Sequence, residues 1–128
     1  MDTVLWIVQV VLAIAFAGAG FTHIRAAAAD PASPRRPGME WMSAVPPNAL
    51  RTIGILEVLG AIGLVVPPLT GIAPWLAPVA AAALALLMVF AIVFHARRGN
   101  ETMNIVFNAI LGAVALVVAI GRGFVEPF

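Results

Sequence analysis

Five side chains with acid–base or hydrogen-bonding chemistry lie at the ends of, or inside, otherwise apolar segments. They are His23, Glu57, His95, Asn104 and Asn108. Imidazole and carboxyl groups bind and release protons, and the asparagine amide both donates and accepts hydrogen bonds. Such groups are costly in an apolar environment, so each needs a partner or a function. We therefore expect these five residues to gather either in one polar cluster or in a pocket that opens to the cytoplasm.

Glu57 is the most informative of the five. Arg51 lies six residues before it and on another face of a helix, so Arg25 or a histidine is an equally suitable partner. One interpretation is structural: a neutral or arginine-paired carboxyl that fixes the helix register. The other is functional: a carboxylate that binds a proton, a cation or a ligand. The sequence leaves both interpretations open.

The histidines and asparagines also have alternative interpretations. His23 and His95 fall near predicted helix C-termini, where imidazole side chains commonly reach the membrane interface. A metal site shared with Glu57, or axial ligation of a haem, is the alternative for the two histidines. Asn104 and Asn108 are typical of hydrogen bonds between membrane helices.

No nucleophile triad, phosphate-binding glycine loop or dinucleotide fingerprint occurs in the sequence. We therefore assign no catalytic residue and no metal ligand, and we name no cofactor. The chain has no Cys, which excludes disulfides, thiol redox chemistry, zinc–thiolate sites and Cys-ligated iron–sulfur clusters. A net charge of +1 gives no basis for binding nucleic acid.

The composition indicates which elements must position these residues. Of the 128 residues, 62% are hydrophobic and 10% charged, and the mean hydropathy is +1.06. A soluble domain of this size cannot bury so much apolar surface, so we expect contact with a lipid bilayer. The predicted fold is an all-α transmembrane four-helix bundle forming a single domain, 1–128. Its spans cover about 3–24, 48–66, 74–95 and 103–120.

Local signals define the ends of these spans. Asp2 or Thr3 can cap the first span, whose length and lack of a basic start favour a retained helix over a signal peptide. Five prolines exclude a long helix from loop 25–47, where Trp41 suggests a short segment at the membrane interface. Pro67 and Pro68 are predicted to end the second span.

Small residues accompany the polar ones at helical spacing. Gly54 and Gly60 lie on the face of Glu57, and Ala19 and Gly20 precede His23. Membrane helices pack closely through such faces. The polar side chains are therefore expected to point into the bundle.

The arginine distribution predicts the orientation. Loops 25–47 and 96–102 carry Arg25, Arg35, Arg36, Arg97 and Arg98, whereas the other side carries only Arg122. The positive-inside rule places both loops in the cytoplasm and both termini outside, in the cell (inner) membrane. The five polar residues then lie in the cytoplasmic half, and Gln9 lies in the outer half.

Several short motifs resemble those of a known family. They are Gly20-Phe21-Thr22-His23, the run Gly54-Ile55-Leu56-Glu57-Val58-Leu59-Gly60-Ala61-Ile62-Gly63-Leu64 before Pro67, Thr70-Gly71-Ile72, and His95-Ala96-Arg97-Arg98. Together they resemble the DoxX-like family of small bacterial membrane proteins, over nearly the whole chain. The resemblance implies a compact four-helix membrane fold. That family is named after similarity to a subunit of a thiosulfate:quinone oxidoreductase, and some members are associated with oxidative-stress complexes.

Three functional hypotheses follow. The first is an accessory or scaffold subunit without enzymatic activity, acting as a homo-oligomer or with other membrane-complex subunits; the lack of catalytic groups favours it. The second is a small-molecule binder or transporter with Glu57 as a protonatable site. The third is a quinone-linked oxidoreductase subunit, with His23 or His95 donating a hydrogen bond to the quinone.

Overall fold

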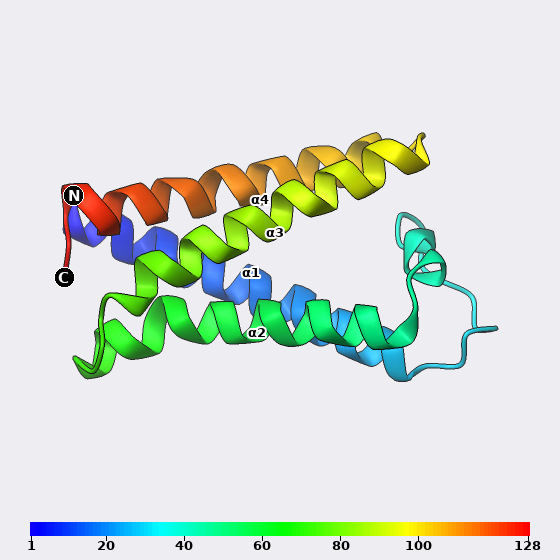
Figure 1. Cartoon of the computed structure of the whole chain (residues 1–128), viewed down its shortest axis with the longest axis horizontal. Helices are drawn as coiled ribbons and strands as arrows, with labels where there is room; N and C mark the ends of the chain where they lie inside the picture. Colours follow the sequence, from blue (N-terminus) through cyan, green and yellow to red (C-terminus); the bar gives the residue numbers. More distant parts are fainter.

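The computed structural model describes all 128 residues and contains four long helices (Figure 1). They are α1 (Asp2–Ala28), α2 (Pro47–Thr70), α3 (Leu76–Arg98) and α4 (Thr102–Ile120), with the short helical segments η1 (Glu40–Ala44) and η2 (Gly121–Val125). All four long helices have the length and apolar composition needed to cross a membrane, and the chain has no strands. The all-α fold with four membrane-spanning helices is thus confirmed.

The helices form two antiparallel pairs. α1 packs along α2 and α3 packs along α4, whereas contacts between the two pairs are fewer. Figure 1 shows the pairs close together near the two chain termini and diverging toward the end that carries residues 29–46. We call these the terminus end and the loop end. The divergence leaves room for a cavity at the loop end.

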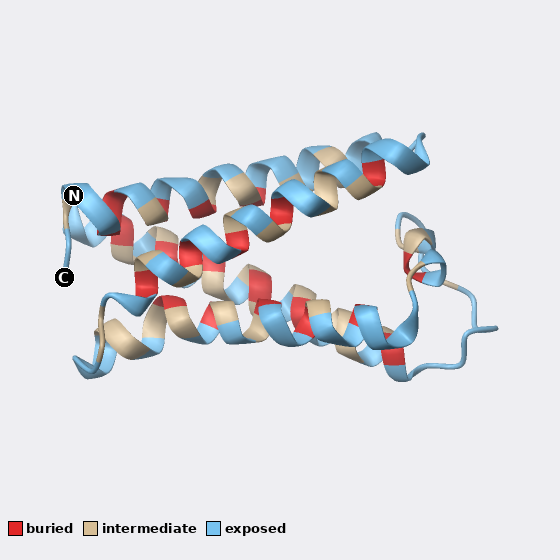
Figure 2. Cartoon of the chain, viewed as in Figure 1, coloured by how far each residue is buried: buried red, intermediate tan, exposed pale blue.

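The main hydrophobic core lies between the middle of the bundle and the terminus end. Side chains from all four helices meet there, and Figure 2 shows their buried positions facing inward. Its buried members are Leu12, Phe16, Ala61, Leu64, Ala81, Leu84, Met88, Leu111, Ala115 and Val118. Many large hydrophobic side chains on the outer faces remain exposed, as expected for surfaces that contact lipid.

Two glycines bring α1 and α2 into close contact. A Cβ on Gly20 would lie 2.6 Å from the Gly54 carbonyl oxygen, and a Cβ on Gly54 would lie 2.6 Å from that of Gly20. Any larger residue would therefore push the helices apart. His23 and Glu57 follow these glycines by three residues each, so the same contact places their side chains side by side.

The prediction that Pro67 and Pro68 end the second helix is wrong, because α2 continues to Thr70. Pro68 has no N–H to donate to the Leu64 carbonyl four residues earlier. The side chain of Gln9 on α1 replaces that donor, with a Nε2–O distance of 2.8 Å. A neighbouring helix thus satisfies the carbonyl group that the proline leaves free.

A buried arginine links the helices at the terminus end. It lies on η2, which continues α4 as one wide helical turn. The side chain of Arg122 is fully buried, and its Nε donates to Gln9 Oε1 at 2.6 Å. Its Nη1 donates to Asp2 Oδ1 at 2.6 Å and to the Glu126 carbonyl oxygen at 3.1 Å. Asp2 therefore pairs with Arg122; neither it nor Thr3 caps α1, contrary to expectation.

Candidate functional site

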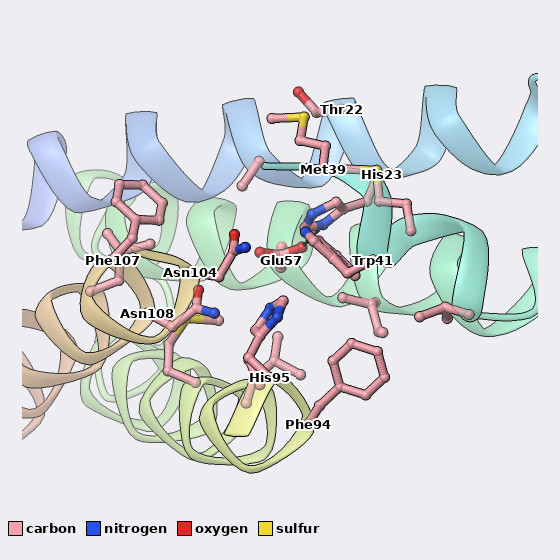
Figure 3. A pocket seen from close by; sticks show the side chains of 18 of the residues that line it. Thr22, His23, Met39, Trp41, Glu57, Phe94, His95, Asn104, Phe107 and Asn108 are labelled. Atoms are coloured by element: carbon pink, nitrogen blue, oxygen red, sulfur yellow. Dashed lines mark hydrogen bonds and ion pairs between the residues drawn. The ribbon is translucent and has the colours of Figure 1, made fainter. Parts of the chain in front are cut away.

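A cavity of about 790 Å³ opens between the two helix pairs at the loop end (Figure 3). Side chains from all four long helices and from residues 37–46 line it. All five polar residues selected from the sequence are among them: His23, Glu57, His95, Asn104 and Asn108. The fold therefore brings together residues that lie up to 85 positions apart in the chain.

The carboxyl group of Glu57 pairs with His23. Glu57 is only 2% exposed, and its Oε1 accepts a hydrogen bond from, or forms an ion pair with, Nδ1 of His23. Of the partners considered from the sequence, the histidine is therefore the one that contacts Glu57. The pair links α1 to α2 one turn beyond the Gly20–Gly54 contact.

His95 on the opposite wall has a similar arrangement. Its Nδ1 lies 2.9 Å from Oε1 of Glu101, which also accepts a hydrogen bond from Nε of Arg98 at 3.0 Å. Partial burial raises the pKa of Glu101, but the hydrogen bonds and positive charges of His95 and Arg98 outweigh it and hold that pKa below its ordinary value. Glu101 is therefore a carboxylate near neutral pH, and it orients the His95 ring.

Trp41 on η1 lies between the two imidazoles. Its ring centroid is 5.4 Å from that of His23 and 5.1 Å from that of His95, in edge-to-face geometry. A similar contact joins Trp41 to Phe94 at 6.0 Å. The segment holding Trp41, which the sequence predicts at the membrane interface, lines the cavity at its loop end.

The two asparagines have different surroundings. Asn104 Nδ2 donates to the Gly38 carbonyl oxygen at 3.1 Å, which ties α4 to the loop before η1. Asn108 lies one turn deeper and has no hydrogen-bond partner within the protein, although it lines the cavity (Figure 3). Neither asparagine makes the hydrogen bond to another long helix that the sequence predicts.

Several polar atoms in the cavity are left without a protein partner. Every fully buried side-chain nitrogen or oxygen has a hydrogen-bond partner, so a polar atom without a partner must be accessible. Glu57 bonds only through Oε1 and lines the cavity, so its Oε2 is accessible from the cavity. Nε2 of His23 and Nε2 of His95 are free in the same way. The site can thus form hydrogen bonds to a molecule in the cavity, whereas no group of three or more His, Asp or Glu residues is arranged to hold a metal ion.

The rest of the lining is apolar and reaches the outer surface on two sides. Phe107 on α4, 58% exposed, and Gly18 on α1 line the cavity on one side. Phe90 on α3, 63% exposed, and Ile53 on α2 line it on the other. Exposed apolar residues thus line the cavity on both of the sides where the two helix pairs face each other.

Sequence reasoning missed two residues of this site. The sequence does not mark Glu101 as a site residue, because a glutamate in a polar loop is usually solvated. It marks Trp41 as an interface residue but does not predict its contact with the histidines. The signal that identifies Glu101 is its position among His95, Arg97 and Arg98, because a carboxylate in a short turn can reach the last turn of the preceding helix.

Four apolar helices around a largely apolar cavity with a few polar groups define a small multi-pass α-helical membrane protein. A family model described as the DoxX-like family matches residues 7–118, and the chain belongs to this family. No curated protein and no solved structure matches the chain. The resemblance in the motifs around His23 and Glu57 is thereby confirmed at the level of the family.

Proposed function

We propose that this protein binds a small, largely apolar molecule in the cavity, with Glu57 and His23 anchoring its polar group. The main support for this proposal is that several polar side chains with free hydrogen-bonding atoms point into an otherwise apolar cavity of about 790 Å³. Natural ligand sites combine a volume of about 300–1,000 Å³ with a few convergent polar groups. The functional interpretation of Glu57 is thus the one we adopt.

A purely structural role for Glu57 explains less of this arrangement. A carboxyl that only fixed the helix register would be expected to have both oxygens satisfied by the protein, because an unpaired polar atom in an apolar site is costly. Here Oε2 stays free and faces the cavity, as do Nε2 of His23 and Nε2 of His95. A ligand with hydrogen-bonding groups supplies the missing partners.

Binding accounts for the geometry better than transport does. The cavity lies at the loop end; of the ten buried residues of the main core only Met88 and Leu111 line it, and the others fill the bundle beyond it. Passage across the membrane would require that core to open. The accessory-subunit hypothesis rests on family resemblance and on the lack of catalytic groups. The redox hypothesis needs a bound quinone, and no residue of the cavity is specific for a quinone.

We also propose that the loop end faces the cytoplasm of a cell (inner) membrane. Six of the seven arginines lie in or next to residues 25–47 and 96–102, and only Arg122 lies at the terminus end. Arg122 is buried and paired with Asp2, so it adds little to the positive charge of that side. The positive-inside rule then favours cytoplasmic loops and external termini.

Native mass spectrometry tests the binding proposal. The wild type and Glu57→Gln are released from nanodiscs, and masses bound to each are compared. Glutamine keeps the size of the side chain and one acceptor oxygen, but it replaces the other oxygen by an N–H donor and cannot be ionised. We expect a small molecule on the wild type and its loss, or a reduction of at least about tenfold, in the variant. Equal occupancy of both proteins would refute a role for Glu57.

A further inference from the structure

The cavity offers free hydrogen-bond acceptors beside the amide donors of Asn104 and Asn108. Oε2 of Glu57 can only accept when the carboxyl is ionised. Asn104 uses its Nδ2 on Gly38, which leaves its Oδ1 free to accept. His23 and His95 each bond a glutamate through Nδ1, so Nε2 of each ring is an acceptor when the ring is neutral and a donor when it is protonated. A complementary ligand therefore carries N–H or O–H donors.

The charges around the cavity favour a cation over an anion. No arginine lines it, and the chain has no lysine. Two of the arginines at the loop end are already engaged: Arg98 pairs with Glu101, and Arg35 bonds Ser43 and the Ala26 carbonyl oxygen. Glu57 is the one acidic residue of the lining. A buried anion would find only the two imidazoles, each already paired with a glutamate, whereas a buried cation finds the carboxyl group of Glu57.

Aromatic rings surround the same region. Trp41, Phe94 and Phe107 line the cavity around the polar groups (Figure 3). Aromatic faces attract cations, and the attraction increases when the cation is removed from water. Deeper in the cavity the lining becomes aliphatic, with Leu87, which packs against the main core, and Leu111, which belongs to it. The site thus offers a carboxylate and aromatic rings near the loop end and an apolar compartment beyond them.

Resting on the binding function proposed above, we infer that the ligand is an amphiphilic amine with a single positive charge. Its ammonium group donates hydrogen bonds to Oε2 of Glu57 and to the free acceptors beside it. Its apolar body lies along the aliphatic part of the cavity, having entered from the bilayer between the helix pairs. His23 keeps Glu57 in position through Nδ1.

Three probes that share one carbon skeleton test this inference: 4-phenylbutylamine, 4-phenylbutan-1-ol and 4-phenylbutyrate. Fluorescence of Trp41 reports occupancy in a Trp6→Phe/Trp75→Phe protein, which leaves Trp41 as the only tryptophan. Nanodiscs of phosphatidylcholine keep the bilayer without net charge. Protein-free nanodiscs correct for partitioning of each probe into lipid, and circular dichroism verifies that the variant is folded.

We expect the amine to bind at least about tenfold more tightly than the alcohol, because a charge-assisted hydrogen bond contributes more than a neutral one. The carboxylate should bind most weakly. Glu57→Gln should remove the advantage of the amine while leaving binding of the alcohol unchanged. Glu40→Gln is the matched control: Glu40 is exposed on η1 and does not line the cavity, so its loss should preserve the advantage.

Other outcomes separate the ligand class from the binding function. Equal affinity for amine and alcohol, or an amine preference that survives Glu57→Gln, would overturn the amine inference and leave a cavity that binds apolar molecules. Tightest binding of the carboxylate would overturn it as well. If no probe alters Trp41 fluorescence, the amine inference fails, and retention of a natural ligand in the mass spectrum still decides the proposed function independently.

Discussion

The carboxyl group of Glu57 has one protein partner and one free oxygen, and this asymmetry is the basis of the functional proposal. Glu101 shows the contrasting case, because both of its oxygens are engaged by neighbouring side chains. The two glutamates also hold the two histidines in equivalent ways, each through Nδ1. A pocket with two imidazoles of fixed orientation results.

Arg122 and Gln9 illustrate what residue types alone do not reveal. The sequence marked Gln9 as a polar residue in the outer half and Arg122 as a charge at the membrane surface. They lie 113 positions apart, yet Gln9 bridges the arginine to the Leu64 carbonyl group. Only the packing of α1 against α2 and η2 brings these groups together, so no local pattern predicts the network.

Replacing Gln9 by Leu should destabilise the protein by about 1–3 kcal/mol, because the Leu64 carbonyl and Nε of Arg122 both lose a buried partner. The free energy of unfolding, measured by SDS titration of detergent-solubilised protein, checks this. Pro68→Ala offers a matched test, since alanine restores the N–H that bonds the Leu64 carbonyl. The cost of Gln9→Leu should be smaller in the Pro68→Ala background; an equal or larger cost would contradict the assignment.

Among the elements, helix identity was predictable and helix ends were less so. Long apolar runs predict membrane helices directly, because backbone N–H and C=O groups without hydrogen bonds are energetically costly in lipid and a helix pairs them all. The predicted end of α2 at Pro67 and Pro68 is wrong because the sequence does not show that Gln9 of α1 donates a hydrogen bond to the Leu64 carbonyl group. The position of η1 was also beyond prediction, since it depends on Met42 packing against Ala27 and Leu50 at the ends of α1 and α2.

The contact between α1 and α2 should be sensitive to a single methyl group. Gly20→Ala places a Cβ against the Gly54 carbonyl oxygen and Val58, so the helices must separate. We expect a loss of about 1–3 kcal/mol in the free energy of unfolding in SDS. Gly18→Ala is the control, because its Cβ meets no atom within 4 Å and alanine favours the helix. Equal stability of the two variants would contradict the close contact.

For the whole molecule, the four-helix membrane architecture was predictable from composition, length and hydropathy. The five polar residues were selected from the rule that polar groups in spans need partners, and they do line one cavity. The cavity itself was not predictable. It exists because the two helix pairs diverge toward the loop end, which depends on side-chain packing in the main core (Figures 1 and 2).

The proposed orientation is testable because the chain has no native cysteine. Single cysteines at Ser33, in the loop after α1, and at Ile72, in the connection between α2 and α3, lie at opposite ends of the bundle, and both positions are exposed. With external termini, a membrane-impermeant maleimide added to intact cells should label Ile72→Cys only. Labelling of Ser33→Cys alone would reverse the orientation.

The central claim is that the cavity itself holds a molecule, and filling the cavity tests it most directly. Ala91→Phe introduces a ring into the lining, whereas Ala82→Phe adds the same ring to an exposed face of α3. Native mass spectrometry from nanodiscs should show a bound molecule on the wild type and on Ala82→Phe, and none on Ala91→Phe. Undiminished retention by Ala91→Phe, or an empty wild type, would contradict the account.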